Sequence, residues 1–263
     1  MLALALELRC AVEAIPDRRW TVRHVGSEYP SGHFDSVLEA ARRAVGEDHP
    51  LSLVVDNRIP IGRGLGSSAA AAVAGAAAAW RAVDEEAHDR AVFELAADME
   101  QHPDNAAAAV YGGLVLCTPD GEVHRLPLHP GIIPILAVPD RALSTSDARA
   151  ALPDMVPRDL AVRSLGRLAA LISGLLLGDG VLLASAHGDE MHQDPRNRLR
   201  PEVELLIETA RSAGALHACW SGAGPSVLAL ADPEATPKVM DALEASMPAG
   251  RVLELRMASA GLI

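Results

Sequence analysis

Three glycines alternate with single residues in the segment Gly62-Arg-Gly-Leu-Gly66, and an alanine-rich stretch over 69–83 follows directly. Alanine is the strongest helix former, so this order predicts a glycine-rich loop over 58–68 that runs into the N-terminus of a helix. The first N–H groups of a helix lack partners within it, and its dipole is positive at that end. Together with the hydroxyls of Ser67 and Ser68, these groups predict a phosphate-binding site.

Two better-known phosphate loops do not match this segment. The dinucleotide pattern G-x-G-x-x-G fails because residue 67 is serine, and the Walker loop fails because no Gly-Lys-Ser/Thr follows. A flexible turn that leads into an alanine-rich helix, with no ligand, is the alternative interpretation.

Apolar patterning predicts an α+β chain with more helix in its second half. Segments 2–14 and 20–25 alternate or run apolar, so we expect an antiparallel pair joined by a turn at 16–18. The basic segment 195–201 predicts a loop, and a second glycine-rich loop follows at 221–226. The other expected strands are 51–55, 114–117, two within 123–138, 216–219, 227–231 and 252–257. The other expected helices are 36–45, 84–101, 106–110 (after a turn at 102–105), 146–152, 157–177, 181–187, 202–213 and 236–246.

Charge and cysteine content limit the partners and the compartment. The 263 residues carry a formal net charge of -12, which repels nucleic acids and anionic membrane surfaces. The 3 cysteines are far apart and form no C-x-x-C pair, as expected for reduced thiols. The start lacks the basic region of a signal peptide, and the longest uncharged stretch, 64–80, falls short of the ~20 apolar residues of a membrane span. We therefore expect a cytoplasmic protein with no nucleic acid or membrane partner.

Five segments resemble known kinases. Pro60-Ile-Gly-Arg-Gly-Leu-Gly-Ser-Ser-Ala-Ala70 resembles the P-x-G-x-G-L-G-S-S-A motif of the GHMP kinases, the superfamily of galactokinase, homoserine kinase, mevalonate kinase and phosphomevalonate kinase. Ser221-Gly-Ala-Gly-Pro-Ser226 resembles their C-terminal glycine loop. Three further segments resemble the homoserine kinase family in particular: His102-Pro-Asp-Asn-Ala-Ala, Ser144-Thr-Ser-Asp-Ala-Arg149 and His192-Gln-Asp-Pro-Arg196.

The resemblance implies an α+β fold of two domains, an ATP-binding domain over 1–137 and a ferredoxin-like domain over 138–263. The first would contain the left-handed βαβ unit of the family, an exception to the ~98% right-handed rule. The implied activity is transfer of the γ-phosphoryl group of ATP, with Mg²⁺, to the side-chain hydroxyl of L-homoserine in threonine biosynthesis. A homodimer is compatible with this interpretation.

The family motifs assign ATP to the first loop, to the helix start and to two glycines of the second loop. These residues are Pro60, Ile61, Gly62, Arg63, Gly64, Leu65, Gly66, Ser67, Ser68, Ala69, Gly222 and Gly224. Because Mg²⁺ bridges the β- and γ-phosphates of ATP, a carboxylate must face the loop. Glu100, with Ser68, matches the magnesium ligands of the family if the alignment contains a short gap, whereas an ungapped alignment selects Glu94.

The amino acid site follows from the remaining family segments. Arg149 and Arg196 are expected to bind the substrate carboxylate, since a guanidinium can form two parallel hydrogen bonds with it. The family pocket adds His102 and Thr145. Most arginines are nonetheless solvated surface residues, and Thr145 equally fits the N-cap of the helix that carries Arg149.

Two residues correspond to the catalytic positions of the family. Asn105 and Asp104 lie where the attacking hydroxyl is oriented, and Asp104 would accept its proton late in a loose transition state. The alternative is a plain turn, because Pro-Asp-Asn favours turns in its own right.

One family segment has no counterpart. Homoserine kinases begin with a strand and loop resembling P-x-x-x-A-N-L-G-x-G-F-D, and this sequence starts just after the matching position. Loss of a central strand would expose a sheet edge, so we expect a misassigned start codon or a truncated chain.

Two other functions stay open from the sequence alone. One is a kinase of another hydroxylated metabolite such as mevalonate, although Arg149 and Arg196 favour an amino acid. The other is a nucleotide-binding protein without catalytic activity. A metal site at 187–192 is not predicted, because the spacing is neither H-E-x-x-H nor H-x-x-E-H.

Overall fold

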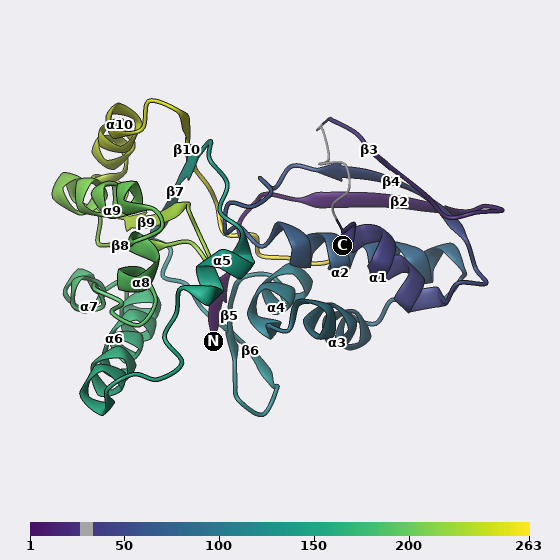
Figure 1. Cartoon of the computed structure of the whole chain (residues 1–263). Helices are drawn as coiled ribbons and strands as arrows, with labels where there is room; N and C mark the ends of the chain where they lie inside the picture. Colours follow the sequence, from purple (N-terminus) through teal and green to yellow (C-terminus); the bar gives the residue numbers. More distant parts are fainter. Residues whose placement is uncertain (27–33) are drawn as a thin grey trace. The chain divides into compact units, whose positions relative to one another are not determined.

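The computed structural model describes residues 1–26 and 34–263. The chain consists of two compact units (Figure 1), the first formed by 1–60, 66–126 and 257–263 and the second by 61–65 and 127–256. The domain boundary predicted between residues 137 and 138 remains a prediction. The units differ from it at residues 61–65, 127–137 and 257–263, which lie in the unit opposite to the one expected.

The described residues of the first unit form two three-stranded sheets. In the order β2-β4-β3, the central strand β4 (Leu51–Asn57) is antiparallel to β2 (Cys10–Pro16) and parallel to β3 (Thr21–His24). The other sheet has the order β1-β5-β6, formed by β1 (Leu2–Leu4), β5 (Leu114–Cys117) and β6 (Val123–Leu126).

The antiparallel pair predicted from segments 2–14 and 20–25 is therefore wrong. The strand β4 lies between β2 and β3. Its alternate side chains Leu51, Leu53 and Val55 point to one face of the sheet, where they are buried against α1 (Ser36–Val45) and the alanine-rich helix that follows the glycine-rich loop. The apolar run at 2–14 is divided between the two sheets, since β1 pairs with β5.

A parallel βαβ unit is formed by β3, α1 (Ser36–Val45) and β4. The side chain of Asp35 caps α1 by accepting hydrogen bonds from the N–H groups of Val37 and Leu38 at 3.0 and 3.1 Å. Helix α1 ends at Gly46, whose φ is 83°. The unit agrees with the family expectation, and its left-handed sense stays a prediction.

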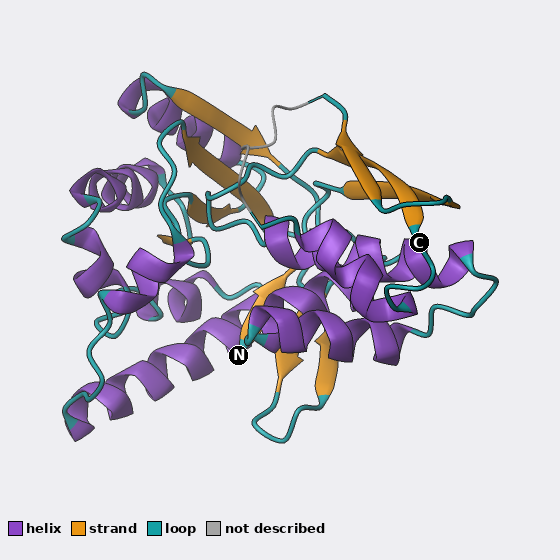
Figure 2. Cartoon of the chain, turned by 45° about the vertical axis from the view of Figure 1, so that its right-hand side comes forward, coloured by secondary structure: helices purple, strands orange, loops and turns teal. Residues whose placement is uncertain are grey.

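The first unit also contains the helices α2 (Ser67–Ala82), α3 (Asp89–Glu100) and α4 (Pro103–Tyr111). The alanines of α2 let neighbouring helices approach closely, and a Cβ on Gly75 would lie 2.9 Å from the Cα of Val37 in α1. The predicted turn at 102–105 is instead the first turn of α4, because proline favours the first helical position. Figure 2 shows these helices packed beside the strands.

The last residues of the chain belong to the first unit. Residue Ala258 donates to the backbone oxygen of Ala5 at 2.9 Å and accepts from the N–H of Gly113 at 2.7 Å. The N–H of Leu262 donates to the backbone oxygen of Val110 at 3.0 Å. The segment 257–263 therefore ties together the N-terminal region and the end of α4.

The second unit contains one antiparallel sheet in the order β10-β7-β9-β8. Its strands are β7 (Ile133–Pro139), β8 (His217–Trp220), β9 (Val227–Ala231) and β10 (Gly250–Glu254). Helix α10 (Thr236–Ser246) connects β9 to β10. The helices between β7 and β8 are α5 (Thr145–Ala150), α6 (Arg158–Leu177), α7 (Gly180–Ser185), α8 (Gln193–Asn197) and α9 (Pro201–Ala213). This βαββαβ succession agrees with the expected ferredoxin-like domain.

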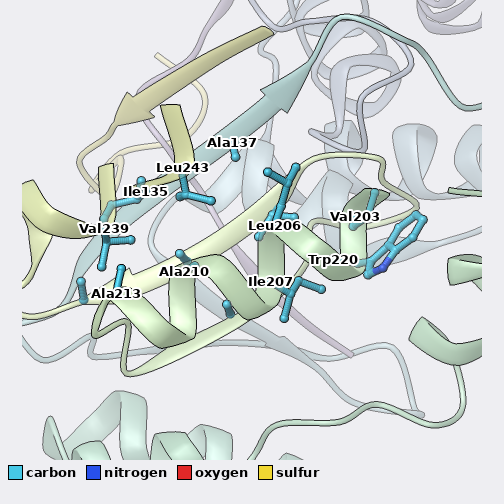
Figure 3. Packing of buried hydrophobic residues seen from close by; sticks show 14 of the residues in the cluster. Ile135, Ala137, Val203, Leu206, Ile207, Ala210, Ala213, Trp220, Val239 and Leu243 are labelled. Carbon is cyan, nitrogen blue, oxygen red and sulfur yellow. The ribbon is translucent and has the colours of Figure 1, made fainter. Parts of the chain in front are cut away.

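The core of the second unit lies between this sheet and helices α9 and α10. Figure 3 shows Leu206 of α9 and Leu243 of α10 near Ile135 and Ala137 of β7, with Trp220 at one end of the cluster. All five side chains are 6% exposed or less.

One helix of the second unit departs from the sequence expectations. Within the predicted basic loop 195–201, residues up to Asn197 form the short helix α8. The 20-residue helix α6 agrees with the predicted 157–177. It contains an 18-residue stretch with a mean hydropathy of 1.6, of which 11% is buried, so α6 is long and apolar enough to cross a membrane. A single helix of this kind is weak evidence for a membrane span. Arg163 and Arg167 of α6 form ion pairs with Glu190.

Candidate active site

The first half of the glycine-rich loop is held within the second unit. The backbone oxygen of Gly62 accepts a hydrogen bond from the N–H of Leu143 at 3.0 Å, and that of Arg63 accepts from Ser226 at 3.3 Å. The hydroxyl of Ser221 donates to the backbone oxygen of Gly64 at 2.9 Å. These three hydrogen bonds fix the backbone of residues 62–64 within the second unit.

The two glycine loops meet backbone to backbone at Gly64. A Cβ on Gly64 would overlap the oxygen of Ser221 and the nitrogen of Gly224, and a Cβ on Gly222 would lie 2.9 Å from the oxygen of Gly64. The φ of Gly64 is 72°, which a side chain would also disfavour. The structure thus brings together the predicted ATP residues of the second unit, 61–65, 222 and 224.

The side chain of Arg63 is directed to backbone carbonyls. Its guanidinium donates to the oxygens of Pro139 at 2.7 Å and Ile61 at 3.0 Å, and also to that of Asp140. Burial lowers the pKa of Arg63, and the negative charge of Asp140 opposes this effect. Because these hydrogen bonds occupy the guanidinium, the side chain of Arg63 stabilises the conformation of the first glycine-rich loop.

The second half of the loop belongs to the first unit and enters α2. Gly66 takes the N-cap position with φ 69°, and within the described part of the chain no side chain caps the helix. The hydroxyl of Ser67 accepts from the side-chain amide of Asn57 at 2.9 Å and donates to the oxygen of Ile59 at 3.3 Å. The start of α2 is therefore fixed while its first N–H groups are free of side-chain partners, as an anion site requires.

The candidate metal ligands lie side by side in the first unit. The hydroxyl of Ser68 donates to Oε1 of Glu100 at 2.6 Å and lies 2.9 Å from the hydroxyl of Ser36. By contrast, Glu94 forms an ion pair with Arg90 one turn earlier on α3. These contacts favour Glu100 over Glu94 as the carboxylate that faces the loop.

The oxygen donors of Ser68 and Glu100 suit magnesium better than they suit a metal whose ligands are all protein side chains. The described residues contain no group of three or more His, Cys, Asp or Glu side chains that could hold a metal ion. Magnesium prefers oxygen ligands, and it typically takes one or two carboxylates together with water and substrate phosphates. One hydroxyl and one carboxylate beside a phosphate loop fit that pattern.

The predicted catalytic residues lie in the first turn of α4. The carboxylate of Asp104 accepts a hydrogen bond from the N–H of Asn105 at 3.0 Å. A Cβ on Gly66 would lie 3.4 Å from Oδ1 of Asn105, so this amide is next to the start of α2. His102 precedes α4 and is partly buried. The first unit therefore brings Asn105 together with the phosphate loop.

The predicted substrate arginines are close to one another in the second unit. Arg196 donates through Nε to the oxygen of Ala148 at 3.3 Å and through Nη1 to that of Gly222 at 2.9 Å. Burial lowers the pKa of Arg196, Asp189 opposes this, and the charge of the nearby Arg149 adds to the lowering. A site with two neighbouring guanidinium groups favours an anion.

The helix that carries Arg149 is capped by Ser144, whose hydroxyl accepts from the N–H of Asp147 at 3.4 Å. The alternative role of Thr145 as N-cap is therefore wrong. Thr145 is the first residue of α5, and its side chain is exposed, as is that of Arg149.

Several residues around the site escaped the sequence analysis. Asn57, Ser36 and Asn197 each make a hydrogen bond to a residue of the loops or next to them. Single polar residues of this kind carry no motif. An asparagine just before the glycine-rich loop and a serine after an N-cap aspartate were the available signals.

Comparison with family models matches both halves of the chain. Residues 32–113 match the GHMP kinases N terminal domain, and residues 161–249 match the GHMP kinases C terminal domain. The two glycine loops and the α+β architecture are those of a GHMP kinase.

Individual relatives narrow the family further. A homoserine kinase from Clavibacter michiganensis subsp. michiganensis is 41% identical over 241 residues, which cover 87% of this chain and 76% of that protein. A homoserine kinase from Thermus thermophilus is 40% identical over 260 residues, covering 97% of this chain and 89% of that protein. The crystal structure of a homoserine kinase from Cytophaga hutchinsonii matches with a TM-score of 0.86 and 26% identity, over 99% of this chain and 90% of that one. The chain belongs to the homoserine kinases, and the resemblance seen in its motifs is confirmed.

Proposed function

We propose that this chain transfers the γ-phosphoryl group of ATP to the side-chain hydroxyl of L-homoserine, giving ADP and O-phospho-L-homoserine for threonine biosynthesis. The observation that carries this proposal is the contact of the two glycine loops at Gly64, on the strand-to-helix connection that leads into α2. The relatives at 40–41% identity, which are homoserine kinases, support the choice of substrate.

The triphosphate binds along the first loop and the N-terminus of α2. Backbone N–H groups of 62–68 donate to phosphate oxygens, and the positive end of the α2 dipole adds favourable electrostatics. The glycines of both loops allow the backbone to approach the nucleotide closely. The residues of this subsite are Pro60, Ile61, Gly62, Arg63, Gly64, Leu65, Gly66, Ser67, Ser68, Ala69, Gly222 and Gly224.

The hydroxyl of Ser68 and the carboxylate of Glu100 would hold Mg²⁺, which neutralises phosphate charge when bound. The hydrogen bond between them supports this role, because it already directs both oxygens to the same place.

The amino acid binds through its carboxylate to Arg149 and Arg196. The family motifs add His102 and Thr145 as hydrogen-bonding groups for the same substrate. The hydrogen bond from Arg196 to the backbone oxygen of Ala148, the residue before Arg149, supports this arrangement, because it brings the two arginines to the same part of the unit.

The reaction needs an oriented hydroxyl and a path for its proton. The side-chain amide of Asn105 orients the hydroxyl oxygen, which forms a bond to the γ-phosphorus while the bond to the ADP oxygen breaks. The carboxylate of Asp104 takes the hydroxyl proton late in this step, as a loose transition state allows. The position of both residues in the first turn of α4 supports this assignment.

A coupled assay of ADP release with homoserine, serine, threonine and mevalonate tests the proposed function. Activity with homoserine that exceeds the activity with the other three alcohols is expected. Preference for mevalonate would indicate a different GHMP kinase, and nucleotide binding without turnover would indicate a non-catalytic protein.

We also propose that the protein is a cytoplasmic homodimer without nucleic acid or membrane partners. The net charge of -12 and the three free cysteines support the compartment and the lack of nucleic acid. The exposed apolar side chains of Val162 and Leu165 on α6 support contact with a second copy. Light scattering after size exclusion measures the assembly.

A further inference from the structure

Asn197, the last residue of α8, holds the indole of Trp220. Its Oδ1 accepts a hydrogen bond from Nε1 of Trp220 at 2.9 Å, across 23 residues of sequence. Trp220 ends β8 and is only 6% exposed, beside the side chain of Val203 at the end of the core cluster (Figure 3). A buried indole N–H needs a partner, and Asn197 provides it.

The indole ring in turn supports the second glycine loop. A Cβ on Gly224 would overlap ring atoms Cε3 and Cζ3 of Trp220, so the backbone of Gly224 lies directly against the ring. The N–H of Gly224 donates to the oxygen of Ser221 at 2.8 Å, which closes the turn. The position of the ring therefore sets the position of this turn.

The same turn limits the first glycine loop. Backbone atoms of Gly224 and Ser221 occupy the space where a Cβ of Gly64 would lie, and the hydroxyl of Ser221 bonds to the oxygen of Gly64. Since proteins are closely packed at such contacts, a shift of the Trp220 ring must displace Gly224 and then Gly64.

We propose that Asn197 is a positioning residue for the phosphate loop, which acts through Trp220 and Gly224 on Gly64. This role rests on the proposed function, in which residues 62–68 bind ATP. Arg196, the preceding residue, donates to the oxygen of Gly222 in the same turn. Two adjacent residues of α8 thus support the second glycine loop: Arg196 through the oxygen of Gly222, and Asn197 through the indole of Trp220.

Amide hydrogen exchange of the ligand-free protein tests the structural part of this proposal. In Asn197→Ala the amides of Gly224 and Ser226 should exchange about tenfold faster, the factor expected for loss of one hydrogen bond. Asn197→Asp keeps an acceptor oxygen of the same shape and should restore slow exchange. Asp194→Ala, a change at an exposed residue of the same helix, is the matched control. Unchanged exchange in Asn197→Ala would overturn the proposal.

Steady-state kinetics test its consequence for the reaction. Asn197→Ala should raise KM for ATP about tenfold with little change in KM for homoserine, and Asn197→Asp should reverse this. An equal rise of both KM values would indicate a general disturbance of α8 and would overturn the positioning role.

Tryptophan fluorescence separates this proposal from the proposed function. In a Trp20→Phe, Trp80→Phe background Trp220 is the remaining tryptophan, and MgADP should change its emission. The same change in the Asn197→Ala form would speak against the proposed linkage. A parent protein that forms no ADP with any substrate, yet shows the exchange effect of Asn197→Ala, would refute the proposed function and leave the positioning of the loop intact.

Discussion

The hydroxyl of Ser68, in the first turn of α2, donates a 2.6 Å hydrogen bond to Oε1 of Glu100, the last residue of α3. This bond joins two helices at the point where the phosphate loop ends. The earlier carboxylate of α3, Glu94, is paired with Arg90 instead.

Replacement of Glu100 by Gln should therefore weaken the response of the enzyme to magnesium. We expect the Mg²⁺ concentration for half-maximal rate to rise about 100-fold, because an anionic oxygen ligand becomes a neutral one. Glu94→Gln, on the same helix, should leave the magnesium titration unchanged. A normal titration in Glu100→Gln, or a shifted one in Glu94→Gln, would reverse the assignment.

Replacement of Gly64 by Ala should abolish tight nucleotide binding. The methyl group would overlap the second glycine loop, and the positive φ adds a backbone penalty. Gly121 is a matched control, because its φ is 86° and, among the described residues, nothing lies within 4 Å of a Cβ placed there. We expect Gly121→Ala to cost about 1 kcal/mol in the free energy of unfolding, and Gly64→Ala to cost about 2 kcal/mol more.

Urea unfolding and MgADP calorimetry measure both effects. Equal stability and equal nucleotide affinity of Gly64→Ala and Gly121→Ala would show that the close approach of the two loops is unimportant.

Replacement of Arg149 by Ala should reduce kcat/KM for homoserine about 10- to 100-fold, the range expected for loss of a charge-assisted pair with the substrate carboxylate. Nucleotide affinity should stay nearly unchanged, because the family resemblance assigns Arg149 to the amino acid. Arg158→Ala, at an exposed position that begins α6, is the control. An equal loss for ATP would remove the assigned role.

The stability of the protein should fall as the pH is lowered from 7 to 5. His217 is 4% exposed, stacks on His187 with ring centroids 4.7 Å apart, and has Nδ1 3.1 Å from the oxygen of Leu183. Burial, with a smaller effect of His187, lowers the pKa of His217 from 6.5 to about 4. The unfolded chain thus binds a proton below pH 6.5 that the folded chain binds only near pH 4.

This difference in proton binding destabilises the folded state by about 2 kcal/mol between pH 7 and pH 5 through His217 alone. His217→Gln removes the titrating ring, so its free energy of unfolding should depend less steeply on pH than that of the parent. Parallel pH profiles for the two proteins in urea unfolding would contradict the assignment to His217.

Elements with strong local signals were predictable from the sequence. The bounds of α1, β9 and α10 agree with the predicted 36–45, 227–231 and 236–246. Helices α1 and α10 each have an apolar helical face, β9 is a short apolar run, and turn residues flank these segments, so no distant contact is needed to define them.

Pairing of distant segments was not predictable in the same way. The insertion of β4 between β2 and β3 depends on pairing with two segments that are distant in sequence, which a local pattern does not encode. Helix α8 is too short to be stable through helix propensity alone. It is held by hydrogen bonds from Arg196 to the oxygen of Gly222 and from Trp220 to Asn197, which are distant in sequence. Motif resemblance found Glu100, and its contact with Ser68 then distinguished it from Glu94.

The course of the chain has a practical consequence for anyone who wishes to separate the two units. Since 257–263 completes the unit that carries Ser68 and Glu100, the span 127–256 is an insertion in that unit. Proteolytic cleavage after residue 126 would release an N-terminal fragment without the strap that bonds Ala5, Gly113 and Val110. An affinity tag or reporter fused after Ile263 would report on the unit that carries Ser68 and Glu100, although the residues just before 257 belong to the unit that carries Arg149 and Arg196.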